Sequence, residues 1–146
     1  MAQGFTGTQH TPFFPQGSLF GLTLSNGTDA TNDIDIAAGT AYDATNTTIM
    51  VLAGVLTKQL DVAWAVGTNA GGLDTGTIAN TTYHIWLIQR IDTGVVDALF
   101  SASATAPTMP ANYTLKRRIG SIVRAAAAIK AFVQDGDQFV WAVMVS

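Results

Sequence analysis

The chain has 146 residues, of which 48% are apolar and 12% are charged, and its formal net charge is −3. This length suits one domain with its own core, and the apolar content excludes an intrinsically disordered chain. A slightly acidic balance gives no general affinity for nucleic acid or anionic membranes. The absence of cysteine excludes disulfides, thiolate metal sites and a cysteine nucleophile.

Residue usage favours strands and turns over helices. All ten acidic residues are aspartates, glutamate is absent, and threonine, glycine and asparagine are frequent. Threonine favours strands, whereas aspartate, asparagine and glycine favour turns. The sequence therefore predicts an all-β fold, an antiparallel β-sandwich or jelly roll over residues 19–146 with an extended N-terminal arm. No apolar run reaches 18 residues, so no membrane insertion is expected.

Residues 1–18 differ from the rest of the chain and are expected to form this arm. Pro12 and Pro15 flank Phe13 and Phe14, so regular structure is opposed while two large apolar side chains are left to bury. The phenylalanines either fold back on their own domain or dock on a neighbouring subunit, and the sequence leaves both open. The candidate docking residues of the arm are Phe5, Phe13 and Phe14.

Short strands separated by turns are predicted from residue 19 onwards. Residues 33–36 alternate with period two, as in a half-buried strand. A turn is expected at Ser25-Asn26-Gly27, and Asn69-Ala70-Gly71-Gly72 is expected to form a flexible loop. The strands expected in this half are 19–24, 33–36, 49–55 and 62–66.

Residues 82–100 carry the strongest local signal, which is that of a β-hairpin. Residues 82–90 and 95–100 are rich in β-branched and aromatic side chains. Between them, Asp92-Thr93-Gly94 places glycine where a hairpin turn requires a positive φ. The alternation puts Tyr83, Ile85 and Leu87 on one face of the first strand, and His84, Trp86 and Ile88 on the other.

The last third is predicted to contain a long connection and further strands. Residues 101–114 lack periodicity and contain two prolines, which suits a crossover from one sheet to another. Four consecutive alanines favour helix within 121–131, but Gly120 and the β-branched neighbours favour strand, turn and strand. The other expected elements are strands at 118–124, 129–134 and 139–145 and a turn at 135–137.

The motif Asp-Thr-Gly occurs twice, and aspartic proteases use two such motifs to bring two carboxylates together. Only 18 positions separate Asp74 from Asp92, too few to place each aspartate on its own lobe. The second motif is already explained by the hairpin turn. A dimer with one motif per subunit is the weakest hypothesis, so no catalytic residue is assigned and the chain is not expected to be an enzyme.

No metal or cofactor site is predicted. His10 and His84 are the only histidines, they are far apart, and His84 is expected to pack beside Trp86 in its strand. The glycine-rich stretch 67–76 lacks the lysine and hydroxyl residue of a phosphate-binding loop. Asp74 alone is a weak calcium ligand.

Basic residues concentrate late in the chain. Residues 1–57 contain no lysine or arginine, whereas five of the seven lie between positions 116 and 130. Such a run is either a solvated edge or a surface for an acidic partner, a sugar acid or the aspartate-rich half of a neighbouring copy. Nucleic acid is not expected as a partner, because no aromatic residues are interleaved with these basic residues. The candidate interface residues are Lys116, Arg117, Arg118 and Arg124.

Three segments carry a family resemblance: Trp64-Ala65-Val66-Gly67-Thr68-Asn69, residues 71–79, and Lys116-Arg117-Arg118-Ile119-Gly120. With their surroundings over residues 22–142, they resemble a domain of tail-fibre and related structural proteins of tailed bacteriophages. The resemblance implies a virion structural role as a homo-oligomer, most often a trimer, with other virion proteins as partners. In that family the domain commonly continues beyond the last strand, so a long fibre is not expected here.

The expected function is a bacteriophage virion structural protein, located in the virion as a tail-fibre, fibre-anchor or baseplate-associated component. It would assemble with its own copies and attach to the particle or the host. One alternative is a capsid decoration protein, of the cement or head-fibre type. Another is a carbohydrate-binding module for a host surface glycan, which would need an exposed aromatic platform. Trp64, Trp86 and Trp141 are assigned to the core.

Overall fold

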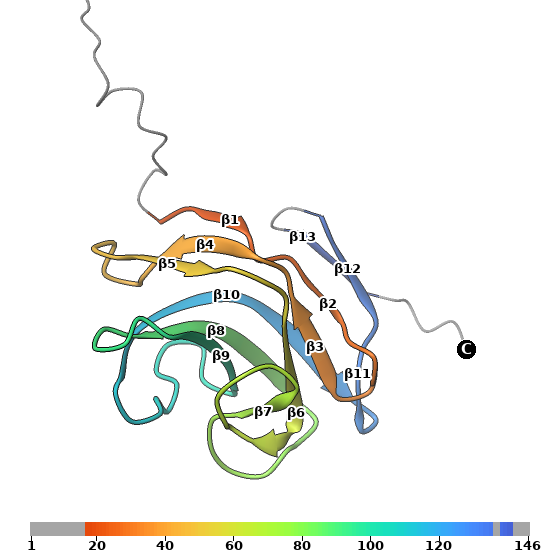
Figure 1. The fold of residues 1–146 in the computed structure, drawn as a ribbon. Coiled ribbons are helices and arrows are strands. Elements are labelled where there is room, and N and C mark those ends of the chain that lie inside the picture. Colours follow the sequence, from red (N-terminus) through yellow and green to blue (C-terminus); the bar gives the residue numbers. More distant parts are fainter. Residues whose placement is uncertain (1–16, 136–137, 142–146) are drawn as a thin grey trace, which may run out of the picture.

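The computed structural model describes residues 17–135 and 138–141, and within this part of the chain it contains strands, turns and loops but no helix (Figure 1). The all-β prediction is confirmed. No helix long and apolar enough to cross a membrane occurs among these residues. The strands are β1 (Leu19–Gly21), β2 (Leu24–Asn26), β3 (Asp33–Ile36), β4 (Gly39–Tyr42), β5 (Ile49–Leu52), β6 (Leu56–Ala63), β7 (Ala70–Leu73), β8 (Thr82–Arg90), β9 (Val96–Ser101), β10 (Tyr113–Ala125), β11 (Ala128–Ile129), β12 (Phe132–Asp135) and β13 (Gln138–Trp141).

Two sheets lie face to face and form the predicted sandwich. The large sheet has the strand order β11-β10-β8-β9-β7-β6-β3-β2, and the small sheet has the order β1-β4-β5. In Figure 1 the small sheet lies above β8, β9 and β10. All pairings are antiparallel except those of β7, which runs parallel to both β6 and β9.

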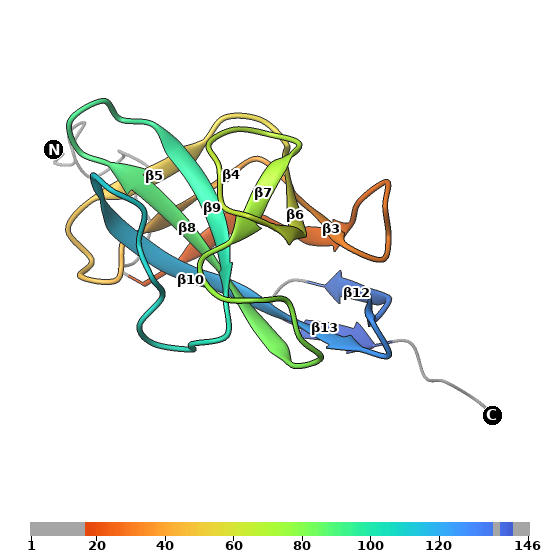
Figure 2. The same cartoon turned by 90° about the horizontal axis from the view of Figure 1, so that it is seen from below.

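The large sheet curls, so that its last strands approach its first ones. The Ile129 N–H donates to the Thr31 carbonyl at 2.9 Å, and the Leu24 N–H donates to the Gln134 side-chain oxygen at 2.6 Å. The β12–β13 hairpin lies beside β2 (Figure 1), and the view from below shows this hairpin at the opposite end of the fold from the β8–β9 turn (Figure 2). These contacts make the sandwich close to a barrel.

Most of the core fills the space between the two sheets. Ile85, Leu87 and Phe100 of the large sheet are fully buried there, as are Ala41 and Met50 of the small sheet. A second cluster lies on the opposite face of β8 and β9 and consists of Trp86, Ile88, Leu99 and Tyr113. The alternation predicted for β8 is therefore confirmed, because its two sets of apolar residues belong to different clusters.

The predicted β8–β9 hairpin is confirmed. Gln89 pairs with Val96, and the Arg90 N–H donates to the Val95 carbonyl at 3.0 Å. Gly94 has a φ of +77°, which is the backbone conformation for which glycine was expected. The N–H of Gly94 donates to the Arg90 carbonyl at 2.9 Å and closes the turn.

The beginning of the domain differs from the prediction. Leu22 has a φ of +57° and divides the expected strand 19–24 into β1 of the small sheet and β2 of the large sheet. Ser25 and Asn26 belong to β2 and not to a turn; the turn lies around Asp29, whose side chain accepts the Thr31 N–H at 3.0 Å. Strand β4 was not predicted, because Gly39–Tyr42 contains little apolar pattern.

The prediction of a strand at 62–66 is right only for 62 and 63, and the prediction of a loop at 69–72 is right only for Asn69. Strand β6 covers Leu56–Ala63. Its first half was not predicted as a strand because it contains Lys58, which is typical of a surface segment but is fully buried in the structure. Residues 70–73 form β7, where the glycines serve close packing. A Cβ on Gly71 would lie 1.9 Å from the Ala63 carbonyl oxygen, and one on Gly72 would lie 2.6 Å from the Phe100 ring. The strand expected at 49–55 is shorter, since β5 ends at Leu52.

In the last third of the chain, the predicted long connection is present, but it does not cross from one sheet to the other. It joins β9 to β10, which flank β8 in the same sheet, so it does not pass between sheets. The strand–turn–strand prediction is confirmed: Ala126 and Ala127 have φ values of +51° and +62° between β10 and β11, as the central residues of a type I′ turn do. Strands β12 and β13 pair with each other on either side of the predicted turn at 135–137. Residues 136 and 137 of this turn lie outside the described residues, and so do residues 142–146, which include the end of the expected last strand.

Candidate functional site

The outer face of the small sheet carries exposed apolar side chains on its two outer strands, β1 and β5. Phe20 pairs with Thr40, and Thr40 pairs with Val51. Phe20 is 67% exposed and Val51 is 53% exposed, whereas the alternate residue Met50 is fully buried in the core. We call this surface, together with the neighbouring pair Tyr42 and Ile49, the small-sheet face.

The small-sheet face is uncharged. Strands β1, β4 and β5 contain no aspartate, lysine, arginine or histidine. Neighbouring exposed apolar side chains on one surface mark an interaction site more often than isolated ones do. Strand β1 is also an edge of its sheet, and an edge strand can pair with a further strand. The sequence did not reveal this face, because the unrecognised β4 is what joins Phe20 to Val51.

Of the arm, only Gly17 and Ser18 belong to the described residues. Phe5, Phe13 and Phe14 lie outside them, so their role at an interface stays a prediction. The Gly17 carbonyl accepts a hydrogen bond from the Arg117 guanidinium of β10. The described chain therefore begins next to the basic residues that the sequence singled out.

The four predicted basic residues do not form one continuous patch. Lys116 and Arg118 pair with Ile88 and Trp86, so they share the face of β8 that carries Trp86. Arg117 lies between them and starts from the opposite face. Arg124 lies toward the other end of β10, where it donates to the Asn80 side chain at 3.0 Å and to the Ala127 carbonyl at 3.2 Å.

The side chains of Arg117 and Arg118 meet at an open hollow of about 400 Å³ beside Trp86, which we call the Trp86 hollow. Arg118 donates to the Ala104 carbonyl at 3.2 Å, and the Lys116 ammonium lies 6.0 Å from the centre of the Trp86 ring. Trp86 is 4% exposed, and its indole N–H has no hydrogen-bond partner among the described residues. The lining residues are Ala44, Trp86, Ala104, Thr105, Arg117 and Arg118.

The loop between β4 and β5 supplies one wall of the Trp86 hollow, and the buried Asp43 carboxylate fixes that loop. The Ala44 N–H donates to the Lys116 carbonyl at 2.7 Å, which attaches the loop to β10. Burial alone would raise the pKa of Asp43, but hydrogen bonds from the Thr45 hydroxyl and from the N–H groups of Thr48, Thr47 and Thr45 outweigh it and lower the pKa to about 2. The carboxylate is therefore charged in all but strongly acidic solution.

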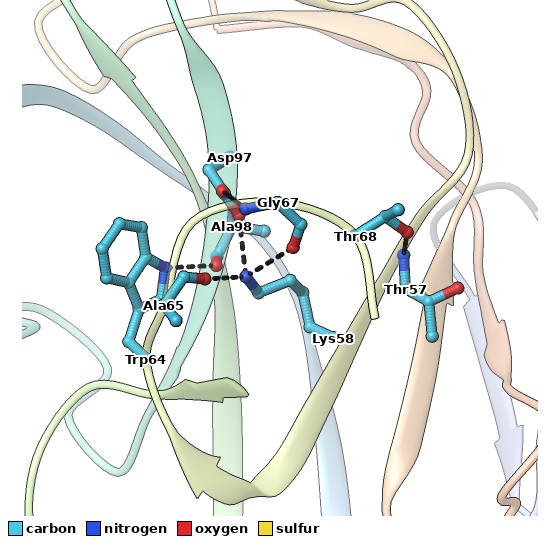
Figure 3. A network of polar contacts seen from close by, with 8 residues as sticks. All are labelled: Thr57, Lys58, Trp64, Ala65, Gly67, Thr68, Asp97 and Ala98. Atoms are coloured by element: carbon cyan, nitrogen blue, oxygen red, sulfur yellow. Dashed lines mark hydrogen bonds and ion pairs between the residues drawn. The ribbon is translucent and has the colours of Figure 1, made fainter. Parts of the chain in front are cut away.

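A buried ion pair fixes a second loop, between β6 and β7. Figure 3 shows the Lys58 ammonium, which lies 3.0 Å from the Asp97 carboxylate and donates to the carbonyls of Ala65 at 2.7 Å and Gly67 at 3.1 Å. Asp97 also accepts the Gly67 N–H at 2.7 Å, and the Trp64 indole N–H donates to the Ala98 carbonyl at 3.0 Å. All three Lys58 donors are occupied, so the network is structural and presents no nucleophile. Burial lowers the pKa of Lys58, and the charge of Asp97 opposes this shift.

The two Asp-Thr-Gly motifs occupy different turns. Asp92 forms an exposed ion pair with Arg90 at 2.7 Å in the β8–β9 hairpin. Asp74 accepts the N–H of Thr108 at 2.8 Å, so it ties the start of one loop to another. Both aspartates thus have local structural partners, and the absence of catalytic function stays a prediction.

His84 packs in the sheet as expected, with its Nδ1 atom 2.8 Å from the Ser121 hydroxyl oxygen. Burial lowers the pKa of His84, and the positive charge of Arg118 lowers it further. Among the residues that the structure describes, no three metal-ligating side chains gather at one point, and Asp74 belongs to no such group. His10 lies outside the described residues.

The three tryptophans differ in burial. Trp86 is buried, while Trp64 and Trp141 are half-buried and pack against the core clusters. The Trp64 ring meets the Tyr113 ring edge-on with 5.2 Å between their centres. Both rings line a groove of about 380 Å³ at the end of the β8–β9 hairpin, which also contains Arg90 and Val95. Trp64 is the nearest feature of this surface to an aromatic platform.

The fold defines the chain as an all-β sandwich protein. Comparisons with protein-family models, with curated proteins and with solved structures gave no match. Its function is therefore argued from its own surfaces.

Proposed function

We propose that this chain is a structural subunit of a bacteriophage virion that assembles with copies of itself through the small-sheet face. The observation that carries the proposal is an uncharged row on three adjacent strands, in which the exposed Phe20 and Val51 lie on either side of the half-buried Thr40. Burying a large apolar side chain contributes roughly 1.5–3 kcal/mol. Several such side chains on one flat face favour a second apolar surface over water.

A second copy of the chain is the partner that this face fits best. A face without charge gives no preference for an acidic or basic partner, so the uncharged faces of further copies can gather against it around a common symmetry axis. Strand β1 is an outer strand of the small sheet, and pairing at an outer strand is one way in which a sheet extends across an interface. The expected assembly is a trimer, as the resemblance to tail-fibre domains implies.

The place in the virion rests on that sequence resemblance. It makes the chain a tail-fibre, fibre-anchor or baseplate-associated component, with capsid decoration as the alternative position. An all-β sandwich without disulfides agrees with a subunit that is stabilised by its own core and by contacts with its copies. The arm, with Phe5, Phe13 and Phe14, is the proposed attachment to other virion proteins.

The assembly proposal is tested by the molar mass of the full chain in solution. Size-exclusion chromatography with light scattering should give about three times the chain mass for the wild type. The double variant Phe20→Ser/Val51→Ser should be a monomer with an unchanged β-type circular dichroism spectrum. Ile91→Ser is the matched control, because Ile91 is 70% exposed but lies at the tip of the β8–β9 hairpin. A wild-type monomer, or an unchanged oligomer in the double variant, contradicts the proposal.

The virion location is tested on the particle. Antibodies against the purified chain should label one structure of the parent phage in electron microscopy. A variant that lacks residues 2–16 should still fold and form its oligomer, but it should no longer attach to particles. Attachment that does not depend on these residues contradicts the docking role of the arm.

A carbohydrate-binding module is a second candidate, favoured by the half-buried Trp64 in the groove beside Tyr113 and Arg90. A host glycan that stacks on Trp64 should quench or shift tryptophan fluorescence in a saturable way, and Trp64→Leu should remove the effect. If no host glycan changes the fluorescence, the groove is only a gap between loops.

A further inference from the structure

The geometry points to a binding site for an oxyanion, a carboxylate or phosphate group of a small molecule or glycan, in the Trp86 hollow. This inference goes beyond the proposed assembly role and does not depend on it. The hollow is lined by residues of β8, of β10 and of the loops that follow β4 and β9, none of which the small-sheet face includes, and three observations on these residues support the inference.

The first observation is unbalanced positive charge. Lys116, Arg117 and Arg118 are consecutive, and none of them lies within ion-pair distance of a carboxylate among the residues described. By contrast, the buried Lys58 and the hairpin residue Arg90 each have an aspartate at 3.0 Å or less. In a chain with a net charge of −3, a cluster of three unpaired cations is a specific local feature.

The second observation is an unused donor. The Trp86 indole N–H is buried and has no acceptor among the described residues. A buried donor without a partner is destabilising, and such groups in native proteins require an explanation. Trp64, in comparison, donates its indole N–H to the Ala98 carbonyl. Trp86 lines the hollow, but its indole nitrogen is itself covered by protein atoms, so a ligand oxygen reaches this donor only when the ring or a neighbouring side chain shifts.

The third observation is the chemistry of the remaining donors. Arg118 uses one terminal nitrogen on the Ala104 carbonyl, and Arg117 uses one on the Gly17 carbonyl. These two bonds fix the direction of both guanidinium groups and leave further N–H groups for a ligand. Arginine donors in a planar array suit the oxygens of a carboxylate or a phosphate better than those of a neutral ligand.

The positive charge of the hollow also affects the neighbouring His84. Arg118 lowers the pKa of His84, after the effect of burial. The wall formed by Ala44 is held in place by the Asp43 loop, so the hollow exists before any ligand binds. The small side chains of Ala44 and Ala104 leave room for a compact anionic group rather than for a large ring.

The inference is tested by nuclear magnetic resonance of the full chain with ¹⁵N-labelled tryptophan. Sodium phosphate is titrated against sodium chloride at equal ionic strength. The indole N–H signal of Trp86 should move in a saturable way with phosphate and not with chloride, while the signals of Trp64 and Trp141 stay in place. The variant Trp86→Phe assigns the signal, because it keeps an aromatic ring and removes the N–H.

Arg118→Gln and Arg117→Gln should each weaken phosphate binding by about tenfold or more, as the loss of a charge-assisted hydrogen bond predicts. Arg124→Gln is the matched control: it removes a cation from the same strand, but its partners are Asn80 and Ala127, and phosphate binding should be unchanged. Unmoved Trp64 and Trp141 signals show that each variant is folded. Glucose 6-phosphate and galacturonate distinguish a phosphate from a carboxylate, with glucose as the neutral control.

Three results would overturn the inference. The Trp86 signal responds equally to chloride and phosphate, so that only ionic strength acts. Binding is the same in Arg118→Gln as in the wild type. Alternatively, phosphate has no effect while Arg118→Gln dissociates the oligomer, in which case the hollow receives a carboxylate of a neighbouring copy.

Discussion

Replacing Asp97 with alanine should destabilise the fold by about 3 to 5 kcal/mol, the loss expected when one partner of a buried ion pair is removed. The Lys58 and Asp97 side chains are 0% and 1% exposed, so water cannot replace the missing carboxylate. The Lys58 ammonium would keep only the carbonyls of Ala65 and Gly67, and the Gly67 N–H would lose its acceptor. A domain of this size has a total stability of roughly 5–15 kcal/mol, so this loss is a large share.

The measurement is the free energy of unfolding in urea, followed by tryptophan fluorescence and circular dichroism. Asp97→Asn is the milder second variant, because it keeps an oxygen acceptor and removes the charge, and its loss should be smaller than that of Asp97→Ala. Lys58→Met should be as damaging as Asp97→Ala, since it leaves a buried carboxylate. The double variant should lose less than the sum of the two, by about 1–3 kcal/mol, because the two residues act as a unit.

The exposed pair of Arg90 and Asp92 is the control. It is shorter, at 2.7 Å against 3.0 Å, but its side chains are 29% and 51% exposed. Arg90→Gln should leave the unfolding midpoint unchanged, because surface ion pairs contribute little. If Asp97→Ala loses less than about 1 kcal/mol, or no more than Arg90→Gln, burial does not decide the strength of these pairs and the reasoning is refuted.

Two further predictions concern the loops and the close packing of β7. Lowering the pH from about 4 to about 2 should remove about 2 kcal/mol of stability. The cause is Asp43, whose pKa is about 2 in the folded protein and 3.8 ordinarily, so the unfolded chain binds the proton first. In urea titrations, Asp43→Asn should be less stable than the wild type at pH 7 and should lack this loss in acid. Gly71→Ala should destabilise the fold by about 1–3 kcal/mol or more, because the new Cβ would collide with the Ala63 carbonyl. Gly54→Ala is the control and should leave the thermal midpoint nearly unchanged, because nothing lies within 4 Å of a Cβ at that position. Equal thermal midpoints in the two variants would contradict the packing role of Gly71.

Local pattern was sufficient where a segment makes its contacts with its sequence neighbours. The β8–β9 hairpin was predicted with its turn and with the two faces of β8, because the alternation of side chains and the position of Gly94 are local properties. The strand–turn–strand arrangement within 121–131 was predicted from the β-branched residues on either side, which outweighed the helix preference of four alanines, whereas the type I′ turn at Ala126 and Ala127 was not.

The sequence pattern gave wrong predictions where polar residues or glycines lie inside the fold. Lys58, near the start of β6, has the sequence pattern of a surface residue, and only the ion pair with the distant Asp97 on β9 makes its burial tolerable. Gly71 and Gly72 read as a loop, and only the neighbouring Ala63 and Phe100 show why these positions must lack a side chain. In each case the deciding partner lies far along the chain.

The candidate sites followed the same division. The sequence indicated Lys116, Arg117 and Arg118 as a group. It did not indicate that the pairing of β8 with β10 places Trp86 beside them, with an indole N–H that has no hydrogen-bond partner among the described residues. The small-sheet face was missed, since Phe20 and Val51 become neighbours only through β4.

The sequence alone determined the all-β class, the sandwich type and the strongest hairpin, because composition and side-chain alternation act between near neighbours. The tertiary structure decided which strands pair, which polar groups are buried with a partner and which apolar groups remain outside. These depend on contacts between residues far apart in the chain, such as Lys58 with Asp97, and no local pattern contains them.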